Sequence, residues 1–256
     1  MFARLPGLQE IHYEPWREWF DLLQRLTDKS LRLLFESLSS DRLRRLVLFE
    51  NFDQTYPASM TWGCVPVRIP SSDVSRVVAN ASLTLEHLSA SFIVDASLFF
   101  DARELSWKWP NLTWLALTSQ LLVPQQRPTE LDDMLRAAAA AAMEMPNLET
   151  MEIWNGKKGL AMLFRYQRAE RGPAVITLRG TWELTLRPLV IQAWDSVALR
   201  HRGQGLVIVK ELLDANACVK SHGDAIRHLK LSRPVIRPVS LRQIQMEHMI
   251  RERVQS

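Results

Sequence analysis

The sequence contains few cysteines, and its charges are nearly balanced. Cys64 and Cys218 are the only two cysteines among 256 residues, and they lie far apart in the chain. This excludes a dense disulfide framework and a CxxC metal site, and it favours a reducing compartment. The 32 Lys and Arg residues exceed the 28 Asp and Glu residues by only four. Charge alone therefore gives no indication of nucleic-acid binding.

Long apolar runs are also missing. No segment approaches the roughly 18 consecutive apolar residues of a membrane-spanning helix, and the N-terminus has no basic region followed by an apolar run. We therefore expect a soluble protein of the cytoplasm or nucleus that binds neither membrane nor nucleic acid.

The common catalytic motifs are absent as well. The sequence has no G-x-S-x-G, no H-E-x-x-H and no Walker loop, and Gly203-Gln204-Gly205 is followed by Ile208 where a dinucleotide fingerprint needs glycine. The six histidines show no metal-ligand spacing with cysteine. The sequence therefore predicts no catalytic residues, no cofactor and no metal, and we expect that the protein is not an enzyme.

A repeated pattern of apolar residues is present instead. The segments PNLTWLAL and PNLETMEI contain Leu-x-x-Leu-x-Leu or a close variant, and six copies with a variable period are found when other apolar residues are allowed. The last two apolar positions are two residues apart, so in a strand they share one face. The copies are Leu8-Ile11-Tyr13, Leu43-Leu46-Leu48, Leu85-Leu88-Ala90, Leu112-Leu115-Leu117, Leu148-Met151-Ile153 and Ile226-Leu229-Leu231.

Proline marks the entrance to several of these expected strands. It precedes the pattern at Pro6, Pro110 and Pro146, where its missing N–H costs no internal ladder bond. The copies therefore predict six short strands, each of which begins at a turn.

Segments with helical signals lie between these strands. Thr129 is a candidate cap for an alanine-rich helix, and Thr27 to Leu38 has apolar residues at helical spacing. Ser72 precedes a third candidate helix, and Ser240 with Gln243 forms a capping box before a fourth. Alternating strands and helices predict an α/β fold with a largely parallel sheet and outer helices.

Residues 156–222 do not follow this alternation of patterned strands and helices. AVITL at 174–178 and TWELTL at 181–186 read as strands joined by a tight turn at Arg179-Gly180, and a helix is expected from Pro188 to Leu199. The region fits an insertion or a strongly diverged repeat within one repeat domain that covers residues 1–256.

The P-x-L-x-x-L-x-L copies resemble degenerate leucine-rich repeats. SHGDAIRHLKLSRPVIRPVSLRQIQME and PNLETMEIWNGKKG also resemble the C-terminal region of fungal F-box-like proteins. The resemblance implies an irregular, curved solenoid interrupted by an insertion, and a role in selecting proteins for a cullin-based ubiquitin ligase. LPGLQEIHY already begins a repeat, so the F-box is not visible in this chain, and ligase docking would need a longer form.

Strand alternation also predicts a candidate binding surface. If Leu115 and Leu117 face the core, Trp114 points to the opposite, exposed face of the sheet. Applied to the other copies, this register gives a row of charged and aromatic side chains, which is either a protein-binding face or an ordinary solvated one. The partner-binding candidates in this row are Arg45, His87, Trp114, Glu152 and Lys230.

We therefore expect a protein-interaction module, and the resemblance implies the specific role of substrate recognition in an F-box-type ubiquitin ligase. The alternative is an enzyme of unrecognised class with its site in residues 156–222. A deep pocket with convergent polar groups in that region would favour the enzyme.

Overall fold

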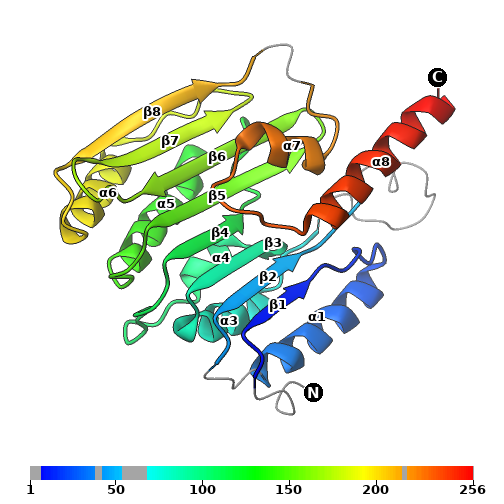
Figure 1. Cartoon of the computed structure of the whole chain (residues 1–256), viewed down its shortest axis with the longest axis horizontal. Helices are drawn as coiled ribbons and strands as arrows, with labels where there is room; N and C mark the ends of the chain where they lie inside the picture. Colours follow the sequence, from blue (N-terminus) through cyan, green and yellow to red (C-terminus); the bar gives the residue numbers. More distant parts are fainter. Residues whose placement is uncertain (1–6, 38–41, 54–67, 215–217, 256) are drawn as a thin grey trace.

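In the part of the chain that the structure describes, eight strands form one open sheet and follow the order of the sequence (Figure 1). This computed structural model describes residues 7–37, 42–53, 68–214 and 218–255, with side chains described up to residue 247. Pro6, Leu38 and Cys64, which entered the sequence analysis, lie outside the described residues.

The first five strands are parallel, and the repeated apolar pattern lies in register across them. They are β1 (Glu10–Tyr13), β2 (Arg45–Phe49), β3 (His87–Asp95), β4 (Trp114–Thr118) and β5 (Thr150–Lys157). The middle apolar residue of each copy pairs with the same position of the next copy. The aligned residues are Ile11, Leu46, Leu88, Leu115 and Met151. The first five predicted strands are therefore confirmed.

Helices cover one face of the sheet, and most of them lie behind it in Figure 1. They are α1 (Asp21–Glu36), α3 (Ser72–Ala81), α4 (Ala96–Asp101), α5 (Pro128–Ala142) and α6 (Pro188–Arg200), and a 3₁₀ turn, η2 (Ser82–Thr84), follows α3. Their inner faces and the apolar side of the strands form the larger of two hydrophobic cores. The α/β class, the largely parallel sheet and the outer helices are thus confirmed.

The starts of α5 and α3 differ from the prediction. Helix α5 is preceded by Arg127 and has Pro128 in its first turn, so Thr129 is not the cap. Pro128 suits this position because its missing N–H would be unpaired there in any helix. At α3 the cap is Ser71, whose hydroxyl accepts a hydrogen bond from the N–H of Val74.

Residues 156–222 extend the same sheet. β6 (Leu160–Gln167) and β7 (Ala174–Gly180) are antiparallel to their predecessors, and β8 (Leu206–Leu212) is parallel to β7. The strand at AVITL is confirmed, but Arg179 and Gly180 continue that strand, and Thr181 to Leu186 form no strand. A tight turn at Gly159 joins β5 to β6, and its φ of 75° favours glycine.

The opposite face of the sheet is partly covered by the C-terminal part of the chain. Helix α7 (His222–Leu229) lies over β5 and β6, and α8 (Pro238–Gln255) extends away from the sheet beyond it (Figure 1). Ala225, Leu229, Val235 and Ile236 pack here in a second hydrophobic core, together with Phe49, Trp114, Trp154 and Leu163 of the sheet.

The sixth predicted strand is therefore wrong. Ile226 and Leu229 belong to α7, because Ser221 and Asp224 form a capping box that starts the helix and Lys230 ends it in the left-handed conformation. A spacing of three residues also places two apolar side chains on one face of a helix. The capping box expected at Ser240 is wrong too, since α8 already begins at Pro238.

Candidate functional site

Two of the five predicted binding residues are buried. Trp114 is 3% exposed and Glu152 is 0% exposed, so the expectation that they face solvent is wrong. Arg45 is exposed and His87 is half-buried, while Lys230 is exposed but follows α7 instead of lying in a strand. Alternation assigned the correct side of the sheet to Trp114. The C-terminal segment 230–237, which follows α7, covers that side.

Glu152 and Trp114 both bind this segment through Ser232. The Ser232 N–H donates to Glu152 Oε1 at 2.8 Å, and Trp114 Nε1 donates to Ser232 Oγ at 2.9 Å. Arg165 Nε lies 3.1 Å from the same carboxylate. Burial raises the pKa of Glu152, although the Ser232 hydrogen bond and the Arg165 charge oppose it. Two residues of the predicted row therefore hold a segment of the chain itself.

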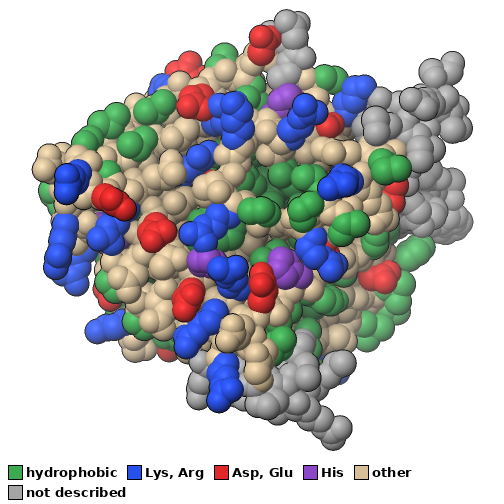
Figure 2. All heavy atoms as spheres, in the orientation of Figure 1, with side chains coloured by type: hydrophobic (Ala, Val, Ile, Leu, Met, Phe, Trp, Pro, Cys, Tyr) green, Lys and Arg blue, Asp and Glu red, His purple; other side chains and the backbone are tan. Residues whose placement is uncertain are grey.

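His87 joins the same contact from β3. Arg233 Nη1 lies 2.8 Å from His87 Nε2, and the His87 ring packs edge-on against Trp114. Burial lowers the pKa of His87, and the charges of Arg233 and Arg45 lower it further. The ring is therefore neutral near neutral pH and accepts from Arg233. Figure 2 shows this face, where Lys, Arg and His side chains are interspersed with hydrophobic ones.

Two titratable side chains of residues 156–222 meet in the core. The Tyr166 hydroxyl lies 3.1 Å from His201 Nδ1, and both residues are buried. Burial raises the pKa of Tyr166 to about 12 and lowers that of His201. Both groups are therefore neutral near neutral pH. Their contact stabilises the packing of β6 against the C-terminal end of α6.

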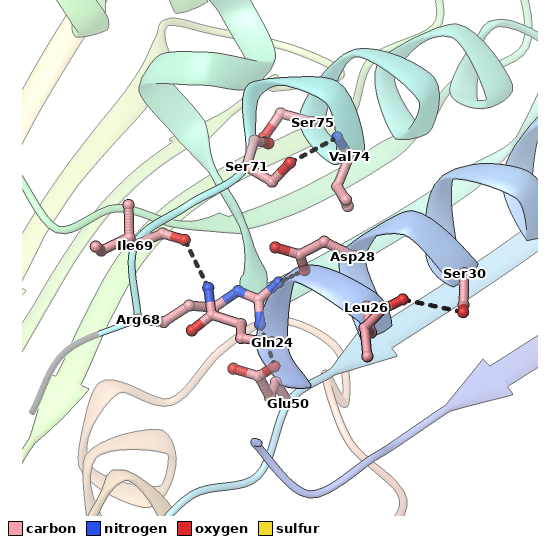
Figure 3. A network of polar contacts seen from close by, with 10 residues as sticks. All are labelled: Gln24, Leu26, Asp28, Ser30, Glu50, Arg68, Ile69, Ser71, Val74 and Ser75. Atoms are coloured by element: carbon pink, nitrogen blue, oxygen red, sulfur yellow. Dashed lines mark hydrogen bonds and ion pairs between the residues drawn. The ribbon is translucent and has the colours of Figure 1, made fainter. Parts of the chain in front are cut away.

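A buried charged cluster lies at the other end of the sheet, between α1, α3 and the end of β2 (Figure 3). Arg68 forms ion pairs with Asp28 of α1 and with Glu50, which directly follows β2; the Glu50 pair measures 2.5 Å. Gln24 Nε2 donates to the carbonyl of Ile69 at 3.1 Å. Arg68 therefore ties α1 to the sheet and to the segment that enters α3.

Glu50 is strongly perturbed by this environment. Burial raises its pKa to about 7, against the lowering effects of Arg68 and Arg17. Its second oxygen, Oε2, has no hydrogen-bond partner among the described residues. Glu50 therefore changes its charge near neutral pH while it remains buried.

A pocket opens on the outer side of this cluster. Its volume is about 290 Å³. α1 provides three cationic side chains and one carboxylate to its walls, and the start of α3 provides the rest. The lining residues are Arg25, Asp28, Lys29, Arg32, Ser71 and Asp73. Asp28 belongs to both the pocket and the buried cluster, so the two are continuous.

The outer surface of α1 beside this pocket is apolar. Leu22, Leu26 and Leu33 are 69%, 54% and 53% exposed, and their spacing places them on one stripe of the helix. This stripe lies opposite the buried residues Gln24, Leu31 and Phe35. Three further exposed apolar residues extend the surface at its N-terminal end: Trp16, Phe20 and Leu23. We call these six residues the α1 apolar surface.

This surface could not be predicted from the helical spacing that begins at Thr27. That range contains Leu31 and Phe35 of the inner face but excludes Leu22 and Leu26. A helix that starts six residues earlier shows two apolar stripes on opposite sides. Arg68 offered no local signal, because its partners lie 18 and 40 positions away in the sequence.

Comparison with known protein families gives a match over residues 37–237 to a family described as "Family of unknown function (DUF6546)". The chain belongs to this family. The DUF6546 match contains β2 to α7, and with them Glu50, Arg68 and the Ser232 contact, whereas α1 precedes it. Searches of curated proteins and of solved structures gave no match.

Two further classes of site can be assessed for the described residues. No group of three or more His, Cys, Asp or Glu side chains among them is arranged to hold a metal ion. No helix within the same residues is long and apolar enough to span a bilayer.

Proposed function

We propose that this chain is a protein-interaction module that binds a partner protein through the α1 apolar surface. The observation that carries the proposal is the clustering of six exposed, large apolar side chains within residues 16–33. Isolated exposed leucines are common on soluble proteins, whereas several large exposed apolar side chains along one helix and its entrance are typical of a binding surface.

The energetics support the same proposal. Burying one leucine side chain yields roughly 1.5–3 kcal/mol, so covering four leucines and two aromatic rings supplies a substantial part of a binding free energy. Helix α1 does not need these residues for its own packing, because Leu31 and Phe35 already anchor it to the core. The ion pairs of Arg68 with Asp28 and Glu50 also hold α1 against the sheet.

The proposed interaction through α1 does not depend on the row of binding residues predicted on the sheet. A partner-binding role for His87, Trp114 and Glu152 requires that segment 230–237 first leaves the sheet, because their polar groups are engaged with it. Arg45 and Lys230 are accessible without this change. Their role in binding stays a prediction.

A more specific proposal concerns the fold family of the chain and the pathway in which it acts. We propose that the five aligned strands, the first four of which lead into helices, form a degenerate leucine-rich-repeat solenoid. The shared register of their apolar positions supports this proposal. Substrate recognition for a cullin-based ubiquitin ligase rests on the sequence resemblance. Recovery of a cullin complex with the full-length natural protein would support that role, and its consistent absence would count against it.

The experiment for the interaction proposal compares two matched double variants. Leu22→Gln with Leu33→Gln alters α1, and Leu189→Gln with Leu199→Gln alters α6, whose two leucines are 61% and 60% exposed. We expect affinity purification and mass spectrometry to recover the same partners with the wild type and the α6 variant, and to lose them with the α1 variant. Circular dichroism checks that both variants are folded. Equal recovery by both variants would overturn the proposal.

A further inference from the structure

We infer that the partner segment bound by α1 is an acidic amphipathic helix that lies along the α1 apolar surface and directs a carboxylate into the pocket between α1 and α3. This inference rests on the proposed function, because it uses the same surface. It adds the secondary structure and the charge of the partner.

The shape of the surface fits a helix. Leu22, Leu26 and Leu33 form a stripe parallel to the axis of α1, and the stripe is roughly 16 Å long at the rise of an α-helix. A second helix with apolar residues three and four positions apart presents a stripe of the same form. The two stripes can therefore pack against each other over about three turns.

The charge beside the stripe fits an acidic partner. Arg25, Lys29 and Arg32 follow one another at spacings of four and three residues, so they form a basic row along one side of the leucines. All three also line the pocket. A helix that carries carboxylates along the matching side of its own apolar stripe would face this row.

The cationic side chains of the basic row can bind the carboxylates of a partner. Arg25 pairs with Asp21 and Arg32 with Glu36 along the exposed surface of α1, and such exposed pairs are weak and exchange readily. Lys29 has no acidic partner in the part of the chain that the structure describes. Asp28, a carboxylate of the pocket wall, is already paired with Arg68. Asp73 lies in the first turn of α3, where the helix dipole stabilises its charge.

The pocket favours a protein partner over an anionic membrane surface. Both would be attracted by leucines with a basic flank. However, the three cations border a recess between two helices, and a flat layer of lipid headgroups cannot enter a recess as a single side chain can. Asp73 at the rim would also oppose a continuous sheet of negative charge.

The test uses the full chain and two synthetic peptides of roughly 18 residues, or five helical turns. Both carry the same leucine stripe; one has glutamates along its flank and the other has lysines at the same positions. We expect fluorescence anisotropy to show binding of the glutamate peptide that is roughly tenfold tighter than that of the lysine peptide, and we expect the difference to shrink at high salt.

A charge reversal then locates the interaction. Lys29→Glu with Arg32→Glu should invert the preference between the two peptides. The matched control, Arg136→Glu with Arg200→Glu on α5 and α6, should leave the preference unchanged. Equal binding of both peptides by the wild type, or a preference that Lys29→Glu with Arg32→Glu does not alter, would overturn the inference.

Two further outcomes separate this inference from the proposed function. Loss of native partners in the Leu22→Gln, Leu33→Gln variant, together with no selectivity for the glutamate peptide, would leave α1 as an interaction surface and reject the acidic helix. Sedimentation of the wild type with phosphatidylserine vesicles, but not with phosphatidylcholine vesicles, together with no peptide binding, would reject a protein partner in favour of a membrane.

Discussion

Trp114 Nε1 donates a hydrogen bond to Ser232 Oγ across 118 positions of sequence. Trp114 begins β4, a central strand of the sheet, and Ser232 lies in the segment that leads into α8. The contact shows that this face of the sheet is built from two distant parts of the chain. Trp114 is therefore a structural anchor in this state of the protein.

The first prediction concerns this anchor. Trp114→Ala should lower the free energy of unfolding by about 3–5 kcal/mol, because it removes a large side chain that is almost fully buried. Ser232→Ala should lower it by only about 1 kcal/mol, the value of one hydrogen bond. Urea unfolding measures both. Trp16→Ala, at a position that is 46% exposed, is the control, and a similar loss for Trp16 and Trp114 would contradict the burial of Trp114.

Removal of Arg68 should have a large effect for an electrostatic reason. Arg68→Met leaves the carboxylates of Asp28 and Glu50 without their partner, and a broken buried pair costs about 3–5 kcal/mol of unfolding free energy. Adding Asp28→Asn and Glu50→Gln should restore part of this loss, because the uncompensated charges are then gone. Chemical unfolding of the single and triple variants measures these free energies. A triple variant that is less stable than Arg68→Met would refute the electrostatic explanation.

Glu50 should make stability depend on pH. Its folded pKa of about 7 lies above the ordinary value of 4.5, so folding favours the protonated carboxyl. The resulting stabilisation is complete below pH 4.5 and is lost as the pH rises through 7. The size of the effect is on the order of 3 kcal/mol. Unfolding free energies at pH 5 and pH 8 measure it. The Glu50→Gln variant should lack this component, and an identical pH profile in the variant would exclude Glu50 as its source.

Lys230 offers a prediction of opposite sign. Its φ of 52° lies in the left-handed region, where glycine has no steric cost and lysine does. Lys230→Gly should therefore raise the free energy of unfolding by about 0.5–1 kcal/mol, as measured by thermal or urea denaturation. Lys230→Ala tests the explanation, because it removes the charge but keeps the Cβ atom. A gain in stability from alanine equal to that from glycine would show that charge, and not backbone conformation, is responsible.

The strands could be predicted where local sequence decides the structure. Leu115 and Leu117 are two positions apart and face the helices, and the same spacing located four further strands. Ile226 and Leu229 were wrongly predicted to lie in a strand, because three-residue spacing fits strand entrances and helices alike. Ser221 and Asp224 decided between them through a capping box. The position of a cap is therefore as informative as the apolar pattern.

Only part of the candidate site could be predicted from the sequence. The stripe of Leu22, Leu26 and Leu33 can be read from the sequence once the helix start is known. By contrast, the pairing of Arg68 with Asp28 and Glu50, and the covering of Trp114, depend on how distant segments meet. Nothing near Trp114 in the sequence indicates that residues 230–237 return to it.

The late position of the covering segment affects how the protein is made. At 5–20 residues per second, a ribosome needs about 6 to 24 s to proceed from Trp114 to Ser232. In the later part of this interval, once Trp154 has also been synthesised, the aromatic face formed by Phe49, Trp114 and Trp154 is complete but lacks its cover. A nascent chain in this state is exposed to aggregation and is a substrate for chaperones. Docking of α7 and segment 230–237 should therefore be the step that completes folding and releases the chain from that risk.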